Sequence, residues 1–174
     1  MVLPGHLAAG YITTFLTITT LGYSFTPTEQ TLLFTAGTIL GNAPDLDIFF
    51  SFLKNKSVGV SSIKGHRDNI THVPFLWLIL GIIVWFSSTS DFYKTLGILL
   101  WLCPWIHLIC DSIFTDTGVR WFAPFTKRSV MTFKKQPENF PSSWPNLFYK
   151  YAQNPLCYLE LSFVVIALVI FIYR

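Results

Sequence analysis

Charged residues are scarce in this sequence. Asp, Glu, Lys and Arg make up 12% of the 174 residues, whereas 52% are hydrophobic; a typical soluble domain is about 25% charged. A soluble domain of this length could not bury so much apolar surface, and a disordered chain would have fewer apolar residues and a net charge further from zero than +3. A basic stripe or an aromatic platform for nucleic acid is also missing. The composition therefore predicts a membrane protein with no nucleic-acid partner.

Cysteine is equally sparse. The three cysteines lie in apolar stretches, and their number and spacing match neither a zinc knuckle nor a disulfide framework. We expect them to act as small core hydrophobes. No basic residue precedes the first apolar stretch, so the N-terminus does not resemble a signal peptide. Without internal repeats, the sequence predicts one membrane-embedded domain over residues 1–174.

Five apolar stretches predict an all-α, polytopic membrane fold. Three of them approach the roughly 17–25 residues that a transmembrane helix needs. The first stretch is rich in threonine and the second is short, so these two form either full spans or a shallow hairpin. In chain order the stretches are 7–25, 31–43, 73–88, 95–114 and 156–173.

The basic residues predict how the helices are oriented. Ten of the twelve fall in two loops, one before the third stretch and one before the fifth, which five alternating helices place on the same side. By the positive-inside rule this side is cytoplasmic, and so is the N-terminus. The ten are Lys54, Lys56, Lys64, Arg67, Arg120, Lys127, Arg128, Lys134, Lys135 and Lys150.

The second of these loops, 115–154, mixes aromatic residues with lysines, arginines and prolines. This composition is typical of segments that lie at the interface of an anionic leaflet, so we expect contact with membrane lipids. The loop is either a lid that delivers lipid to a site or only an anchor, and we favour the anchor.

Histidines and aspartates lie in or beside the apolar stretches, where such residues are costly and usually functional. In the predicted topology they gather at the cytoplasmic ends of the helices, with His6 just before the first helix. The gathered polar residues are His6, Asp45, Asp47, His66, Arg67, His72, His107 and Asp111.

Two short motifs carry paired ligands. His107 and Asp111 are four residues apart, so they share a helix face and can bind one cation, or form a buried hydrogen bond that ties helices together. Asp45 and Asp47 follow Pro44 in a turn, where they can converge on a divalent ion. The alternative is that Asp45 caps the next helix.

The segment 65–74 is the strongest signal. Pro74 fits the first turn of a helix, which places Thr71 and His72 at an amino end that favours anions. Arg67 adds a planar cation suited to phosphate or carboxylate, unless it only meets lipid headgroups. His66 and His72 are either metal ligands or interfacial hydrogen-bonding residues.

Taken together, these side chains predict a metal site of nitrogen and oxygen ligands. Such a ligand set without thiolate suits Zn²⁺, Mn²⁺ or Fe²⁺, and there are enough ligands for one or two ions. The predicted ligands are His6, Asp45, Asp47, His66, His72, His107 and Asp111.

The same motifs resemble a known family. Gly5-His6, Pro44-Asp45-Leu46-Asp47, His66-Arg67 with Thr71-His72, and His107-x-x-x-Asp111 followed by Thr115 and Gly118 are similar to the YdjM-like inner-membrane proteins. The resemblance runs from about residue 5 to residue 124. It implies a helical membrane fold and a metal-dependent hydrolase. Val73 stands where the family is expected to have serine.

These observations lead to a functional hypothesis: a membrane-bound divalent-metal hydrolase that acts on an ester or phosphoester, such as a lipid headgroup. An unligated carboxylate, Asp47 or Asp111, would accept a proton from water, and Arg67 would stabilise the developing negative charge. The alternatives are a non-catalytic scaffold stabilised by metal, and a proton-coupled transporter.

Overall fold

The computed structural model describes residues 3–46, 48, 69–114, 118–126, 128–130, 149, 152–153 and 156–174. Over these residues the chain is all-helical, as predicted. It has five α-helices and two short 3-10 turns, and the only pairing of extended chain described is an isolated bridge between Val119 and Val130.

The five helices correspond in order to the five apolar stretches. Their bounds are α1 Leu3–Leu21, α2 Pro27–Leu40, α5 Pro74–Ser87, α6 Asp91–Phe114 and α8 Leu156–Tyr173. The two 3-10 turns are η1, Ala43–Asp45, and η3, Ile70–His72.

Three helices, α1, α2 and α6, each begin four residues earlier than the apolar pattern indicates. α1 already includes His6, which was expected just before the helix. The first turn of α1, starting at Leu3 and Pro4, is helical although it is less apolar than the stretch that follows. α2 begins at Pro27 because Thr26 and Glu29 form a capping box, in which each side chain bonds the other residue's backbone N–H.

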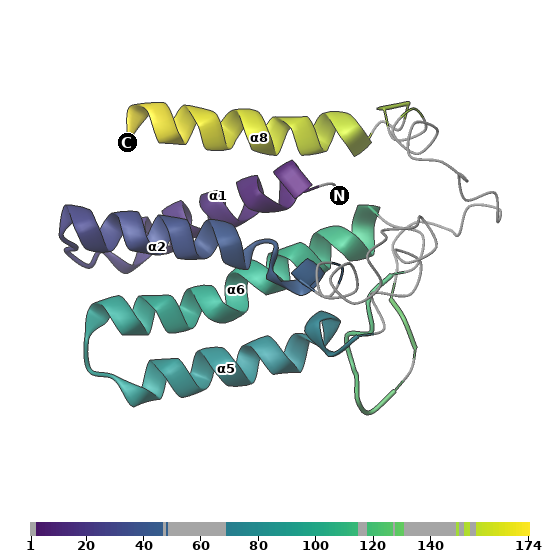
Figure 1. Cartoon of the computed structure of the whole chain (residues 1–174), viewed down its shortest axis with the longest axis horizontal. Coiled ribbons are helices and arrows are strands. Elements are labelled where there is room, and N and C mark those ends of the chain that lie inside the picture. The colour runs from purple at the N-terminus through teal and green to yellow at the C-terminus, as the bar shows by residue number, and fades with distance from the viewer. Residues whose placement is uncertain are drawn as a thin grey trace.

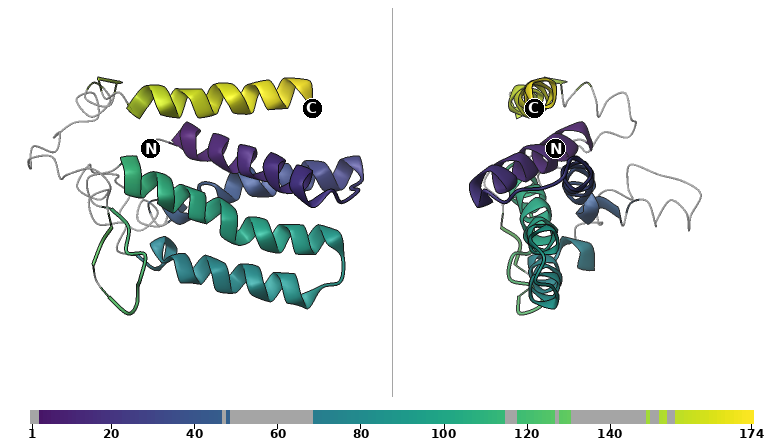
Figure 2. Two further views of the ribbon diagram at one scale, coloured as in Figure 1. Left: turned by 180° about the vertical axis from the view of Figure 1, so that it is seen from behind. Right: turned by 90° about the vertical axis from the view of Figure 1, so that its left-hand side faces the viewer.

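The helices lie side by side (Figures 1 and 2). The turn between α1 and α2, the turn between α5 and α6, and the C-terminus share one end of the bundle. The N-terminus, η1, η3 and the last turns of α6 lie at the opposite end. The bundle therefore brings residues from distant parts of the sequence together at its N-terminal end.

Glycines allow the paired helices to approach closely. A methyl group on Gly41 would come within 2.5 Å of the His6 carbonyl oxygen, and one on Gly81 within 2.6 Å of the Gly97 carbonyl oxygen. Small residues serve the same purpose in other membrane bundles. The contact of Gly41 with α1 fixes the end of α2 beside His6.

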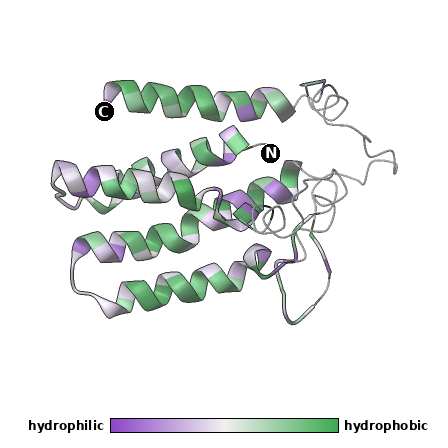
Figure 3. Cartoon of the chain, in the orientation of Figure 1, coloured by the Kyte–Doolittle hydropathy of each residue, from purple (hydrophilic) through white to green (hydrophobic). Residues whose placement is uncertain are grey.

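Among the described helices, one is long and apolar enough to cross a membrane: Asp91–Ile113 within α6. α5 and the Cys157–Tyr173 part of α8 are apolar but shorter. Both helices are coloured hydrophobic along most of their length in Figure 3. Several of their large hydrophobic side chains are exposed, including Ile83, Phe86 and Phe171. The all-α class is thus established, whereas a membrane span is evident for one of the five predicted helices.

Candidate metal centre

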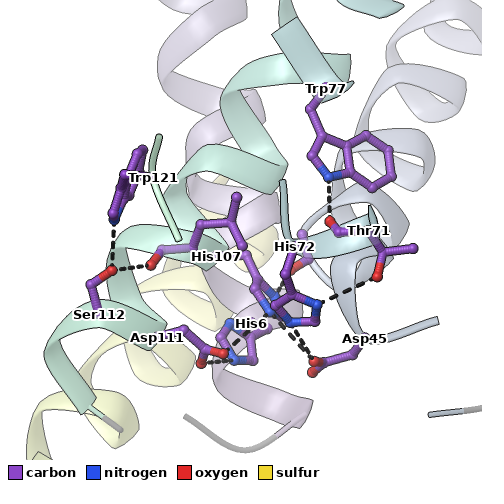
Figure 4. A network of polar contacts seen from close by, with 11 residues as sticks. His6, Asp45, Thr71, His72, Trp77, His107, Asp111, Ser112 and Trp121 are labelled. Atoms are coloured by element: carbon purple, nitrogen blue, oxygen red, sulfur yellow. Dashed lines mark hydrogen bonds and ion pairs between the residues drawn. The ribbon is translucent and has the colours of Figure 1, made fainter. Parts of the chain in front are cut away.

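Four of the predicted ligands meet at the N-terminal end of the bundle (Figure 4). Asp45 comes from η1, His72 from η3, and His107 and Asp111 from α6. One ligand atom from each residue lies within 4.8 Å of those of the other three. His72, His107 and Asp111 are at most 1% exposed, whereas the Asp45 side chain is 21% exposed.

Local sequence explains how α6 and η1 present their ligands. The four-residue spacing on α6 places His107 Nε2 3.9 Å from Asp111 Oδ2, which confirms that these residues share a face. Pro44 lies in the first turn of η1, which ends at Asp45 and turns the chain away from α2.

Two tryptophans position the turn that carries His72. The Trp77 indole N–H donates to the Thr71 carbonyl at 2.7 Å, and the Trp105 indole N–H donates to the Pro74 carbonyl at 3.0 Å. The backbone is therefore held on both sides of His72. Neither tryptophan was among the residues predicted for the site, although tryptophan in an apolar stretch carries a polar N–H that needs an acceptor.

A backbone hydrogen bond determines the tautomer of His107. His107 Nδ1 lies 2.8 Å from the Gly41 carbonyl oxygen. A carbonyl oxygen only accepts hydrogen bonds, so Nδ1 must carry the hydrogen, and Nε2 of the neutral ring presents a lone pair. Nε2 is buried and makes no hydrogen bond to any residue that the structure describes.

This lone pair faces two carboxylates, which favours a cation between them. His107 Nε2 and His72 Nε2 each lie 3.5 Å from Asp45 Oδ1. A charge-assisted N–H···O hydrogen bond is about 2.7–2.9 Å long. Tetrahedral ligands with zinc–ligand bonds of about 2.1 Å lie about 3.4 Å apart. The separations therefore fit ligands around one divalent cation better than direct hydrogen bonds.

The charge of Asp45 suits the same role. Burial alone would raise the pKa of Asp45, but the His107 and His72 imidazoles outweigh burial and lower the pKa below its ordinary value. Asp45 is therefore ionised at neutral pH, as a metal ligand must be.

His6 joins the cluster from α1. Its Nε2 lies 3.5 Å from Asp111 Oδ1, and its ring stacks on that of His107 with the centroids 3.7 Å apart. His6 is 1% exposed. His6 therefore contacts both His107 and Asp111, but it faces Oδ1 of Asp111, whereas His107 faces Oδ2.

The remaining predictions lie largely outside the described residues. Asp47, His66 and Arg67 are among these, and so is most of the loop 115–154. In the described part of that loop, the Trp121 indole donates to Ser112 Oγ at 2.9 Å, next to Asp111.

The chain was compared with individual proteins and with protein families. No curated protein and no solved structure matches the chain. The model of the family described as YdjM inner membrane protein matches residues 1–174. Because the match covers the whole chain, this protein belongs to the YdjM inner membrane protein family.

Proposed function

We propose that the protein is a divalent-metal-dependent hydrolase of the membrane interface, acting on an ester or phosphoester such as a lipid headgroup. The observation that carries this proposal is the orientation of His107. Its Nδ1–H donates to the Gly41 carbonyl, so its Nε2 lone pair faces Asp45 and Asp111. A second ring N–H bound to a carbonyl is the usual support of a metal-bound histidine.

The exposure of Asp45 supports a hydrolase over a closed structural site. A catalytic metal keeps one coordination position for water or substrate, and Asp45 is the ligand with a solvent-facing side. Leu46, which follows Asp45, is 42% exposed, and Ile70, in the turn of His72, is 69% exposed. Apolar residues at this edge suit a substrate that arrives from the membrane.

The chain would contribute proton transfer and charge stabilisation. A bound divalent cation would supply a water of lowered pKa and polarise the oxygen under attack. Asp45 is ionised and its pKa is lowered, so it is suited to hold the cation rather than to accept a proton. A carboxylate that does not coordinate the ion, Asp47 or Asp111, would accept the proton of that water. The amino end of α5, directly after His72, and Arg67 would stabilise negative charge on the substrate.

We also propose a multi-pass topology with the N-terminus and the metal site facing the cytoplasm. α2 and α6 end, and α5 and α8 begin, at the end of the bundle that carries the site (Figure 1). The two connecting segments at this end contain ten of the twelve basic residues. Cytoplasmic placement of this end follows from the positive-inside rule.

One observation favours a second candidate, a non-catalytic scaffold. The ligands come from η1, η3 and α6, and three of the four are almost fully buried. A cation there would tie these elements together even without turnover.

Metal analysis and ester hydrolysis by the detergent-purified protein test both candidates. We expect stoichiometric metal and hydrolysis in the wild type, and loss of both in His72→Ala. The control is Thr19→Ala, because Thr19 is exposed on α1 and bonds only the carbonyl of its own helix at Phe15. Metal without turnover would support the scaffold, and absence of specific metal in the folded wild type would refute the hydrolase.

A further inference from the structure

The stacking of His6 and His107 limits how they can bind metal. Their ring planes are 21° apart and their centroids are 3.7 Å apart (Figure 4). A metal bound to imidazole lies close to the ring plane, along the nitrogen lone pair. Two nearly parallel rings stacked on each other do not direct their lone pairs to one point. The two histidines are therefore not arranged as ligands of a single ion.

Asp111 faces each of these histidines with a different oxygen. Its Oδ1 lies 3.5 Å from His6 Nε2, and its Oδ2 lies 3.9 Å from His107 Nε2. All three residues are 1% exposed. A carboxylate whose two oxygens are directed to two stacked imidazoles has the arrangement of a bridging ligand.

We propose that Asp111 bridges two divalent cations. The first is bound by Asp45, His72, His107 and Asp111 Oδ2, and the second by His6 and Asp111 Oδ1. This inference rests on the metal site of the proposed function and makes that site dinuclear. In two-metal hydrolytic sites the ions are about 3.5–4 Å apart, which matches the 3.7 Å between the stacked rings.

The affinities of the two positions should differ. The first position has four protein ligands, whereas the described residues give the second position two. Water or substrate must complete the second position, so the second cation binds more weakly.

The competing role for His6 is a hydrogen bond that orients Asp111 around a single metal. The 3.5 Å separation is longer than such a charge-assisted bond, which is about 2.7–2.9 Å. His6→Gln separates the two roles. The glutamine amide can still donate a hydrogen bond toward Asp111, but it is a poor ligand for a divalent cation.

The experiment is a Mn²⁺ titration of the full chain, purified in detergent and stripped with chelator. Equilibrium dialysis gives the stoichiometry, and electron paramagnetic resonance reports whether the ions are coupled. We expect two Mn²⁺ per chain, the second bound more weakly, with a spin-coupled spectrum at saturation. His6→Gln should bind one Mn²⁺ and give an uncoupled six-line spectrum.

Tyr11→Phe is the matched control. Tyr11 lies on the same helix, and its buried hydroxyl has no hydrogen-bond partner among the described residues, so its removal should leave two coupled ions. Saturation of the wild type by one Mn²⁺, an uncoupled wild-type spectrum, or two coupled ions in His6→Gln would each overturn the proposal. The spectrum of the wild type decides the question even if His6→Gln does not fold.

The outcome is independent of turnover. One bound ion with intact hydrolysis would refute the bridge and leave the hydrolase standing. Two coupled ions without hydrolysis would support the bridge and refute the hydrolase.

Discussion

At the scale of single residues, Gly41 contributes to the centre although it has no side chain. Its carbonyl oxygen accepts the hydrogen bond from His107 Nδ1, and its Cα faces α1. Removing such a supporting partner of a metal ligand typically weakens metal binding about 10–100-fold. Gly41 is therefore expected to support metal binding although it does not coordinate the ion.

We predict that Gly41→Ala weakens metal binding by about 10-fold or more. The added methyl group would meet the His6 carbonyl at 2.5 Å and Gly10 Cα at 2.9 Å, so α2 must move and the bond to His107 is lost. Metal titration checks this. Thr35→Ala, an exposed position on the same helix, should bind metal as the wild type does. Unchanged affinity in Gly41→Ala would show that the carbonyl does not support the centre.

The ionisation of Asp45 predicts how the metal-free protein responds to acid. In the folded protein the pKa of Asp45 is lowered below the ordinary value of 3.8. The ionised carboxylate therefore stabilises the fold at pH values above 3.8. This stabilisation is lost as the pH falls toward and through the lowered pKa. We predict that the thermal unfolding midpoint, measured in chelator, decreases as the pH is lowered below about 4. Asp45→Asn should show a smaller decrease. An equal fall in both proteins would contradict the prediction.

At the scale of elements, the chain segment that leads into α5 is held in place by hydrogen bonds from tryptophan indoles. Trp105 on α6 donates to the Pro74 carbonyl at the first position of α5. The bond joins the helix that carries His107 to the turn that carries His72. Loss of this bond should therefore change the distance between ligands from different elements.

We predict that Trp105→Phe destabilises the protein and weakens metal binding. The variant loses one buried hydrogen bond, from the indole N–H to the Pro74 carbonyl, which costs about 0.5–1.5 kcal/mol. Unfolding and metal titration measure the two effects. Trp101→Phe is the control, because Trp101 packs edge-on against Trp105 and does not donate to this turn. Equal effects of the two variants would indicate loss of packing rather than of the hydrogen bond.

Elements and ligands differ in how well the sequence predicts them. The apolar runs located both ends of α5 and α8 to within one residue, because these helices are apolar along their length, whereas α6 starts four residues before its apolar run, at Asp91. The early start of α2 depends on a polar capping box outside the apolar run. Helical periodicity predicted that His107 and Asp111 share a face.

The support of the site was less predictable. The Gly41 carbonyl belongs to the backbone, and no residue type marks which carbonyl will meet His107. The stacking of His6 on His107 depends on how closely α1, α2 and α6 pack. Sequence patterns predicted these side chains as candidate ligands, but the contacts between them follow from the three-dimensional packing.

At the scale of the whole molecule, the two ends of the bundle are chemically different. The end opposite the site carries the two short interhelical turns and the C-terminus (Figure 1). The site end carries the N-terminus and the connections rich in basic residues. If the proposed topology is correct, reagents on the two sides of the membrane will reach different ends.

We predict that a membrane-impermeant thiol reagent added to spheroplasts labels Ser24→Cys and Ser88→Cys but not Ser57→Cys. Ser24 and Ser88 lie in the short turns, and Ser57 lies in the first basic segment. The three natural cysteines are replaced by alanine in each variant. Permeabilisation should expose Ser57→Cys, which serves as the positive control. Labelling of Ser57→Cys in sealed spheroplasts would invert the topology.

The close contact between α1 and α2 has a consequence for how this family can change during evolution. Gly10 and Gly41 leave no room for a methyl group, and the backbone they bring together presents both His6 and the carbonyl that supports His107. A mutation at either glycine would displace the histidine cluster without altering His6 or His107 themselves. Relatives that keep this cluster should therefore keep these two glycines as strictly as the histidines, and relatives that have lost one should also have lost the imidazole beside it.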